Sequence, residues 1–256
     1  MIIREAQIKE LEVAALGSFV IELTEHCKEF SPDLCKTLDQ DQLRRAVTQG
    51  VDRADIYGLN LRGPVRFYID LMIVFGSDFD TDPQYPWIAE ELAKEEETDQ
   101  FDRTEAIHTK SQDYLEYVDG PDNVHTLKAL EELSVRMRSG IKFQHQNLDR
   151  HVLQLFSEVH PRKYERTGEA ALRELLDEER TRGQEEYRFE EARSIALMSI
   201  MGFAFGHHFH SDPFLPWISR TLDSNDFETP DKKAEDLERR ALIWLDAVLK
   251  NAKEGK

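Results

Sequence analysis

The sequence predicts an all-α protein of about ten helices, built as two tandem copies of a five-helix unit of roughly 130 residues and packed into one compact body. Apolar residues recur at three- and four-residue steps in successive segments, and no alternating strand pattern of useful length occurs. In addition, one motif returns at a constant offset of 130 residues. With 256 residues, 40% of them hydrophobic, the chain is long enough to bury a sizeable core.

The repeated motif runs over residues 75–92 and returns over residues 205–222. Nine of the eighteen aligned positions are identical, including an Asp-Pro pair, a second proline and a tryptophan. Each Asp-Pro pair is typical of a helix N-cap followed by proline in the first turn. We therefore assign a structural role to the two aspartates, the prolines that follow them and the two tryptophans, which are Asp82, Pro83, Trp87, Asp212, Pro213 and Trp217.

Five segments of the first copy have helical spacing. Their apolar positions predict helices over 8–27, 43–56, 64–76 and 107–118, and a short helix that begins at Asp82-Pro83 and buries Trp87. The segment 64–76 is apolar on almost every side, as is 195–205 in the second copy, so both should be central buried helices. The short stretch 119–123 is the natural junction and divides the chain into domains 1–122 and 123–256.

Charge and composition exclude several classes of function. The chain has 51 acidic and 33 basic side chains. Its net charge of −18 argues against binding to nucleic acids and to anionic membranes. No apolar run is long enough to span a bilayer, and the N-terminus lacks the apolar region of a signal peptide, so we expect a cytoplasmic protein. Cys27 and Cys35 are too few for a disulfide framework or a thiolate zinc site.

The negative charge is concentrated in the first copy. Residues 1–122 carry a net charge of −15 and residues 123–256 only −3. The charge is densest from Glu90 to Asp102, which we call the acidic segment. This segment is either a solvated loop that aids solubility or a docking surface for a cationic partner. On the second interpretation the partner-binding candidates are the acidic residues in and before this segment, namely Asp78, Asp80, Glu90, Glu91, Glu95, Glu96, Glu97 and Asp99.

Catalytic and metal motifs are weak in this sequence. The loop from His207 to Asp212 holds three histidines, but the first copy has no histidine at the aligned positions, so we expect a solvent-facing loop with Phe79 and Phe209 turned inward. Residues 78–89 resemble a calcium loop only at their start. No phosphate-binding glycine loop or nucleophile elbow occurs, and the thiol of Cys27 lies on an apolar stripe. We expect no catalytic residue, metal or cofactor; a metal-dependent hydrolase that uses the histidine loop is the alternative.

One stretch of the first copy is similar to a known group of proteins. The pattern Arg-x-x-x-x-Gly-x-x-Arg-Ala-x-x-Tyr-Gly-Leu over 45–59, with the segment 71–83 and Pro86-Trp87, resembles small helical proteins encoded beside effector, tip-spike or PAAR-type genes of bacterial type VI secretion systems. The second copy departs from it at His207, His208 and His210. The resemblance implies a non-catalytic partner of a toxin.

The sequence thus predicts a non-enzymatic protein-binding protein. Its expected partner is a bacterial toxin effector, basic because a toxin that degrades nucleic acid must bind phosphate. An immunity protein that neutralises the toxin is the first interpretation, and a chaperone or adaptor that holds the effector for loading is the second. A purely structural module that associates with itself is a further alternative.

Overall fold

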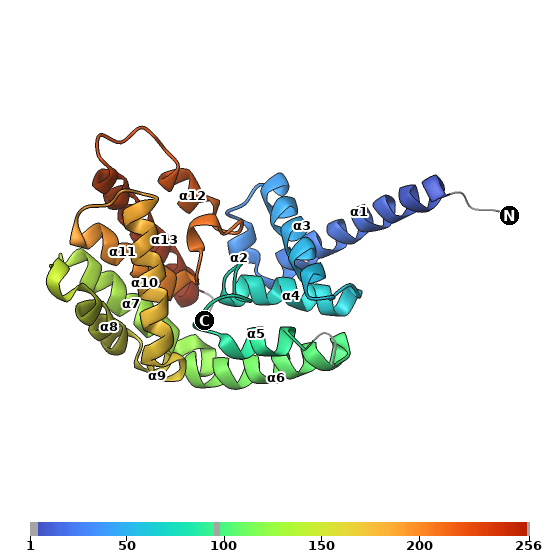
Figure 1. The fold of residues 1–256 in the computed structure, drawn as a ribbon, viewed down its shortest axis with the longest axis horizontal. Coiled ribbons are helices and arrows are strands. Elements are labelled where there is room, and N and C mark those ends of the chain that lie inside the picture. The colour runs from blue at the N-terminus through green and yellow to red at the C-terminus, as the bar shows by residue number, and fades with distance from the viewer. Residues whose placement is uncertain (1–4, 95–97, 255–256) are drawn as a thin grey trace.

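The computed structural model describes residues 5–94 and 98–254, and the regular structure in these residues is entirely helical (Figure 1). The first half contains α1 (Glu5–Phe30), α2 (Pro32–Cys35), α3 (Gln40–Ile56), α4 (Arg62–Phe75), α5 (Pro86–Leu92) and α6 (Gln100–Val118). The second half contains α7 (Val124–Arg138), α8 (Leu148–Val159), α9 (Pro161–Thr167), α10 (Glu169–Glu185), α11 (Ala192–Phe205), α12 (Pro216–Leu222) and α13 (Pro230–Glu254). Three short 3₁₀ turns, η1 (Pro121–Asn123), η2 (His145–Asn147) and η3 (Phe209–Ser211), complete the described regular structure.

The all-α prediction is confirmed, whereas the number of helices was underestimated. The described residues form thirteen α-helices instead of about ten. The short helices α2 and α9 were missed, since a helix of one or two turns offers too few positions for an apolar period. Both begin at a proline and are separated from the preceding helix by a single residue, which is Ser31 before Pro32 and His160 before Pro161.

Local signals in the sequence set several helix boundaries. At the start of α3, Asp39 and Gln42 form a capping box, in which the Gln42 backbone N–H donates to Asp39 Oδ1 (2.8 Å) and the Asp39 N–H donates to Gln42 Oε1 (2.9 Å). Helices α4 and α11 both end at glycines with positive φ, +100° at Gly76 and +97° at Gly206. Only glycine adopts such angles without strain, which explains a glycine at both positions.

Buried apolar side chains form two clusters, one in each half. The first draws on helices α1 to α6 and includes Phe214 from the other half, and the second draws on helices α7 to α13. Helix α11 is buried along almost its whole length, as expected for a central helix. Helix α4 is less enclosed than predicted, because Val74 is 42% exposed. Phe79 and Phe209 are both buried, as predicted.

Helix α1 extends beyond the remainder of the molecule (Figure 1). Its C-terminal half packs through buried residues such as Leu23 and Cys27, whereas Leu11, nearer its N-terminus, is 62% exposed. The apolar stripe that predicted this helix is therefore buried only in part. Across the described ranges, none of the helices is both long enough and apolar enough to cross a membrane.

Candidate functional site

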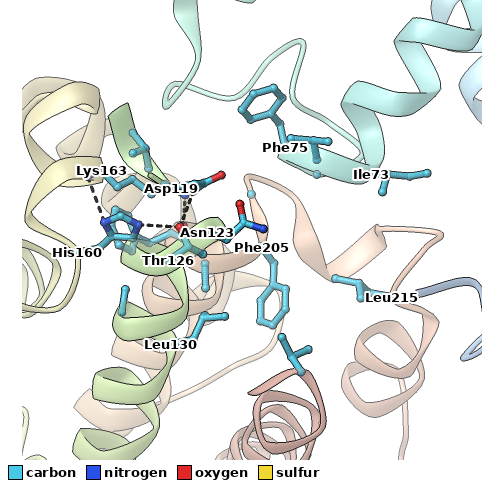
Figure 2. Close-up of a pocket in the computed structure, with 18 of the residues that line it drawn as sticks. Ile73, Phe75, Asp119, Asn123, Thr126, Leu130, His160, Lys163, Phe205 and Leu215 are labelled. Carbon is cyan, nitrogen blue, oxygen red and sulfur yellow. Dashed lines mark hydrogen bonds between the residues drawn. The ribbon is translucent and has the colours of Figure 1, made fainter. Parts of the chain in front are cut away.

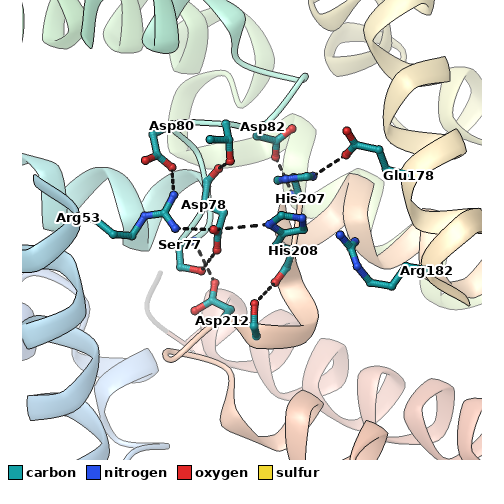
Figure 3. A network of polar contacts seen from close by, with 12 residues as sticks. Arg53, Ser77, Asp78, Asp80, Asp82, Glu178, Arg182, His207, His208 and Asp212 are labelled. Atoms are coloured by element: carbon teal, nitrogen blue, oxygen red, sulfur yellow. Dashed lines mark hydrogen bonds and ion pairs between the residues drawn. The ribbon is translucent and has the colours of Figure 1, made fainter. Parts of the chain in front are cut away.

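The repeated motif contains a loop in each half, residues 76–85 and 206–215, which we call the motif loops. The two motif loops meet at the junction between the halves (Figure 3). A Cβ atom added to Gly76 would lie 2.6 Å from the carbonyl oxygen of Phe205. A Cβ atom added to Gly206 would lie 2.7 Å from the carbonyl oxygen of Phe75. Each glycine therefore allows the backbone of its loop to approach that of the other loop more closely than any side chain would permit.

Two buried aspartates link the loops in a reciprocal way. The backbone N–H of His207 donates to Asp82 Oδ2 (2.7 Å), and the backbone N–H of Ser77 donates to Asp212 Oδ2 (3.2 Å). The other carboxylate oxygen of each aspartate accepts a backbone N–H from two residues further along its own loop, at 2.8 Å in both cases. Each carboxylate therefore fixes its own turn and holds the opposite loop.

This arrangement corrects the prediction made for the Asp-Pro pairs. Helices α5 and α12 begin at Pro86 and Pro216, three residues after Pro83 and Pro213, so the aspartates are not their N-caps. Burial raises the pKa of Asp82 to about 6 and that of Asp212 to about 7, against the lowering effect of the backbone hydrogen bonds. The sequence signal for a cap and for a turn is the same, a short side-chain acceptor beside proline, and here the turn forms.

The prediction that Asp78 and Asp80 lie on a docking surface is wrong, because both residues are buried. They are only 8% and 3% exposed, and both carboxylates pair with the guanidinium of Arg53 on α3 (Figure 3). Arg53 Nη1 donates to Asp78 Oδ1 at 2.6 Å, and the hydroxyl of Tyr68 donates to Asp80 Oδ2 at 2.8 Å. Although burial acts to raise it, the pKa of Asp78 falls to about 2, because His208 and the guanidinium of Arg53 lie beside the carboxylate. Both acids are therefore structural counterions.

The histidine loop is more enclosed than the expected solvent-facing loop. His207 is 6% exposed, with Nδ1 2.9 Å from Glu178 Oε2, and His208 Nδ1 lies 3.6 Å from Asp78 Oδ1 (Figure 3). Burial lowers the pKa of His207 to about 3 and that of His210 to about 4. Within the described residues, no three histidine, cysteine or acidic side chains are grouped so that they could hold a metal ion.

The remaining candidates of the acidic segment are not equivalent. Glu91 is buried and pairs with Lys94 and Lys110, at 2.7 Å in both cases, and these hydrogen bonds lower its pKa. Glu90 and Asp99 are exposed, and Asp99 caps α6 by accepting the backbone N–H of Phe101. Glu95, Glu96 and Glu97 lie outside the described residues.

Helix α6 carries a row of exposed acids that begins within the predicted segment and continues beyond it. Four exposed carboxylates, which we call the α6 acidic ridge, make no ion pair within the described part of the chain; they are Asp102, Glu105, Asp113 and Glu116. At 100° per residue they fall within about 80° of one another, and at 1.5 Å per residue they span about 21 Å. Sequence reasoning missed this ridge, although the spacing of three, eight and three residues was the signal that could have revealed it.

The tryptophans of the motif pack beside the cores. Trp87 lies 6.0 Å from both Phe75 and Tyr114 between ring centroids, and Trp217 lies 6.4 Å from Phe205. Both tryptophans are partly buried. These contacts join the short helices α5 and α12 to the ends of α4 and α11.

Comparisons with known proteins do not assign a family to this chain. No protein-family model matches the chain, and searches of curated proteins and of solved structures found no significant match.

Proposed function

We propose that this chain is a non-catalytic protein that binds a cationic protein partner through the acidic face of its first half. The observation that carries the proposal is the α6 acidic ridge, whose four carboxylates are exposed and make no ion pair within the described residues. Unpaired charges of one sign raise the rate at which an oppositely charged protein arrives.

Helix stability explains only part of this ridge. Asp102 lies in the first turn of α6, where the helix dipole favours a carboxylate, but Glu116 lies in the last turn, where the dipole disfavours one. Like charges three residues apart, such as Asp102 with Glu105 and Asp113 with Glu116, also repel each other slightly. A row of like charges that the helix does not favour throughout supports a role in binding a basic partner.

The partner we propose is a toxin effector of a bacterial type VI secretion system, and the chain its cytoplasmic immunity protein. The support is the resemblance of residues 45–59 and 71–87 to helical proteins encoded beside such effectors, together with the acidic surface. A chaperone or adaptor that carries the effector is the second candidate, because it would present the same charge.

We further infer that the two halves are copies of one helical unit that meet across a pseudo-twofold axis. The inference rests on the nine identities of the motif and on matched geometry around it. Helices α4 and α11 have fourteen residues each and end at Gly76 and Gly206 with nearly equal φ. The hydrogen bonds of Asp82 and Asp212 are also exchanged between the loops, as a twofold axis requires.

The proposal is tested first by recovering the partner and then by charge reversal. A tagged chain is used to recover partners from the native host at low and high salt, and the purified partner is used for association kinetics. Replacing the four carboxylates of the α6 acidic ridge with lysine should slow association at least tenfold at low salt, with little change at high salt.

A matched control separates this ridge from net charge alone. Four exposed acids of the second half, which make no ion pair within the described residues, give the same change in charge when replaced with lysine: Glu174, Glu185, Glu190 and Glu228. The control should slow association much less. Equal effects of the two quadruple variants, or none, would contradict a docking site on α6. A partner toxin that loses activity in the complex indicates immunity, and one that stays active indicates an adaptor.

A further inference from the structure

A cavity of about 590 Å³ lies between the two halves (Figure 2). The C-terminal ends of α4, α6, α11 and α13 reach it, together with residues of α7 and α8. Most of the side chains that line it are apolar, and they include Ile73, Phe75, Leu130, Phe205 and Leu215. Such a cavity is suited to the apolar part of a small molecule.

One end of the cavity is polar and carries a cation. The ammonium of Lys163 donates to the carbonyl oxygen of Phe203 (2.6 Å) and to the hydroxyl oxygen of Tyr85 (3.3 Å). It also lies 4.8 Å from the ring centroid of Phe203 and 5.7 Å from that of Tyr85. An ammonium group has three hydrogens, so these two bonds leave one hydrogen free to donate.

Two tyrosine hydroxyls beside this ammonium add further donors. Tyr114 is 3% exposed, and its hydroxyl lies near those of Tyr85 and Thr167, yet it makes no hydrogen bond within the described residues. Tyr85 already accepts from Lys163, so its own proton needs an acceptor as well. Buried hydroxyls are rarely left without partners, which points to a group that is supplied from outside the chain.

Neither of the nearby carboxylates pairs directly with Lys163. Burial lowers the pKa of Lys163 to about 8, and the charges of Asp82 and Asp119 act against this shift, yet neither forms an ion pair with the ammonium. The hydroxyl of Thr126 donates to Asp119 Oδ1 and also contacts His160 Nε2 (3.2 Å), as Figure 2 shows. Asp82 accepts two backbone N–H groups and a side-chain amide. The third hydrogen of the Lys163 ammonium is therefore left without an acceptor among the described residues.

We propose that this cavity binds an amphipathic monocarboxylate, with its carboxylate on Lys163, Tyr85 and Tyr114 and its apolar tail between Phe75, Phe205 and the walls around them. A carboxylate supplies several lone pairs and one negative charge, which matches one ammonium and two hydroxyls. An alcohol would supply fewer acceptors and no charge. A phosphate would bring up to two negative charges against a single lysine. This site is independent of the proposed toxin partner.

The test is calorimetric titration of the full chain with dodecanoate and octanoate below their micellar concentrations and with dodecanol below its solubility. Dodecanoate should bind more tightly than octanoate, because more tail is buried, and at least about tenfold more tightly than dodecanol, because charged hydrogen bonds are lost with the alcohol. Equal affinity for dodecanoate and dodecanol, or no binding of either, would overturn the proposal.

Two variants locate the head group. Tyr114→Phe removes a hydroxyl that makes no hydrogen bond within the described residues, so the fold should be retained while the affinity for dodecanoate falls several-fold. Lys163→Met should reduce it at least about tenfold, whereas Lys142→Met removes an exposed charge and should leave it unchanged. Dodecanoate binding that is insensitive to both Tyr114→Phe and Lys163→Met would place the ligand elsewhere and refute the site.

Discussion

The contact between the two motif loops can be measured with single methyl groups. In Gly76→Ala, the new Cβ would lie 2.6 Å from the carbonyl oxygen of Phe205, well inside van der Waals contact, at a residue with φ of +100°. The positive φ alone costs about 1–2 kcal/mol for a residue with a side chain. The loops must also move apart, which weakens the charge-assisted hydrogen bonds that cross between them, worth about 1.5–3 kcal/mol each. We expect a total loss of about 3–5 kcal/mol in unfolding free energy.

A second glycine isolates the two contributions. Gly168 has φ of +85° and ψ of 147°, close to the +100° and 154° of Gly76, and a Cβ there would meet nothing within 4 Å, so Gly168→Ala should show the backbone cost alone, about 1–2 kcal/mol. Gly206→Ala should resemble Gly76→Ala. The double variant of Gly76 and Gly206 should lose less than the sum of the single variants, because both relieve the same contact.

The assay is urea denaturation followed by tryptophan fluorescence and far-ultraviolet circular dichroism. Each half contains at least one tryptophan, so both halves are observed. Unfolding free energies of Gly76→Ala and Gly168→Ala that agree within error would refute the reasoning, because the loops would then accommodate the methyl group without separating.

Three other properties follow from buried groups. Because burial raises the pKa of Asp212 from 3.8 to about 7, its contribution to stability is present below pH 3.8 and lost as the pH rises through 7; Asp212→Asn should flatten that decline in urea titrations between pH 4 and 8. Arg53→Met should cost about 3–5 kcal/mol by leaving Asp78 and Asp80 buried without a counterion, and replacing both acids with asparagine should restore most of that loss in thermal unfolding. The thiol of Cys27, whose pKa burial raises to about 12, should react with an aromatic disulfide reagent only after denaturation.

The sequence predicted those parts of the fold that rest on periodic or repeated residues. Helical spacing located the long helices, and the motif correctly marked Phe79 and Phe209 as core residues. The end of α4 at Gly76 followed from glycine alone. These signals are local, so they are present in the sequence before any tertiary contact forms.

The parts that failed depend on contacts between distant segments. Asp78 and Asp80 are acidic like the exposed residues around them, and only the approach of Arg53, about 25 positions earlier, makes them internal counterions. Asp82 has the sequence context of a helix cap, but its second oxygen bonds to His207, 125 residues away. The cavity likewise brings Lys163 to Tyr85, and no spacing along the chain records that approach.

The two loops also suggest why some motif positions are identical and others differ. On the inferred twofold relation, a residue that contacts its own counterpart or makes an exchanged contact has to serve both sides, which favours identity, as at the glycines and at Asp82 and Asp212. Asp78 and His208 depart from this rule, because they occupy the same place in the motif and yet lie 3.6 Å apart across the junction as acid and base. Two aspartates at such a contact would repel each other, so a charged position is favoured to differ between the loops. The histidines that suggest a metal site in the sequence are therefore explained, at His208, as partners of the acidic loop opposite them.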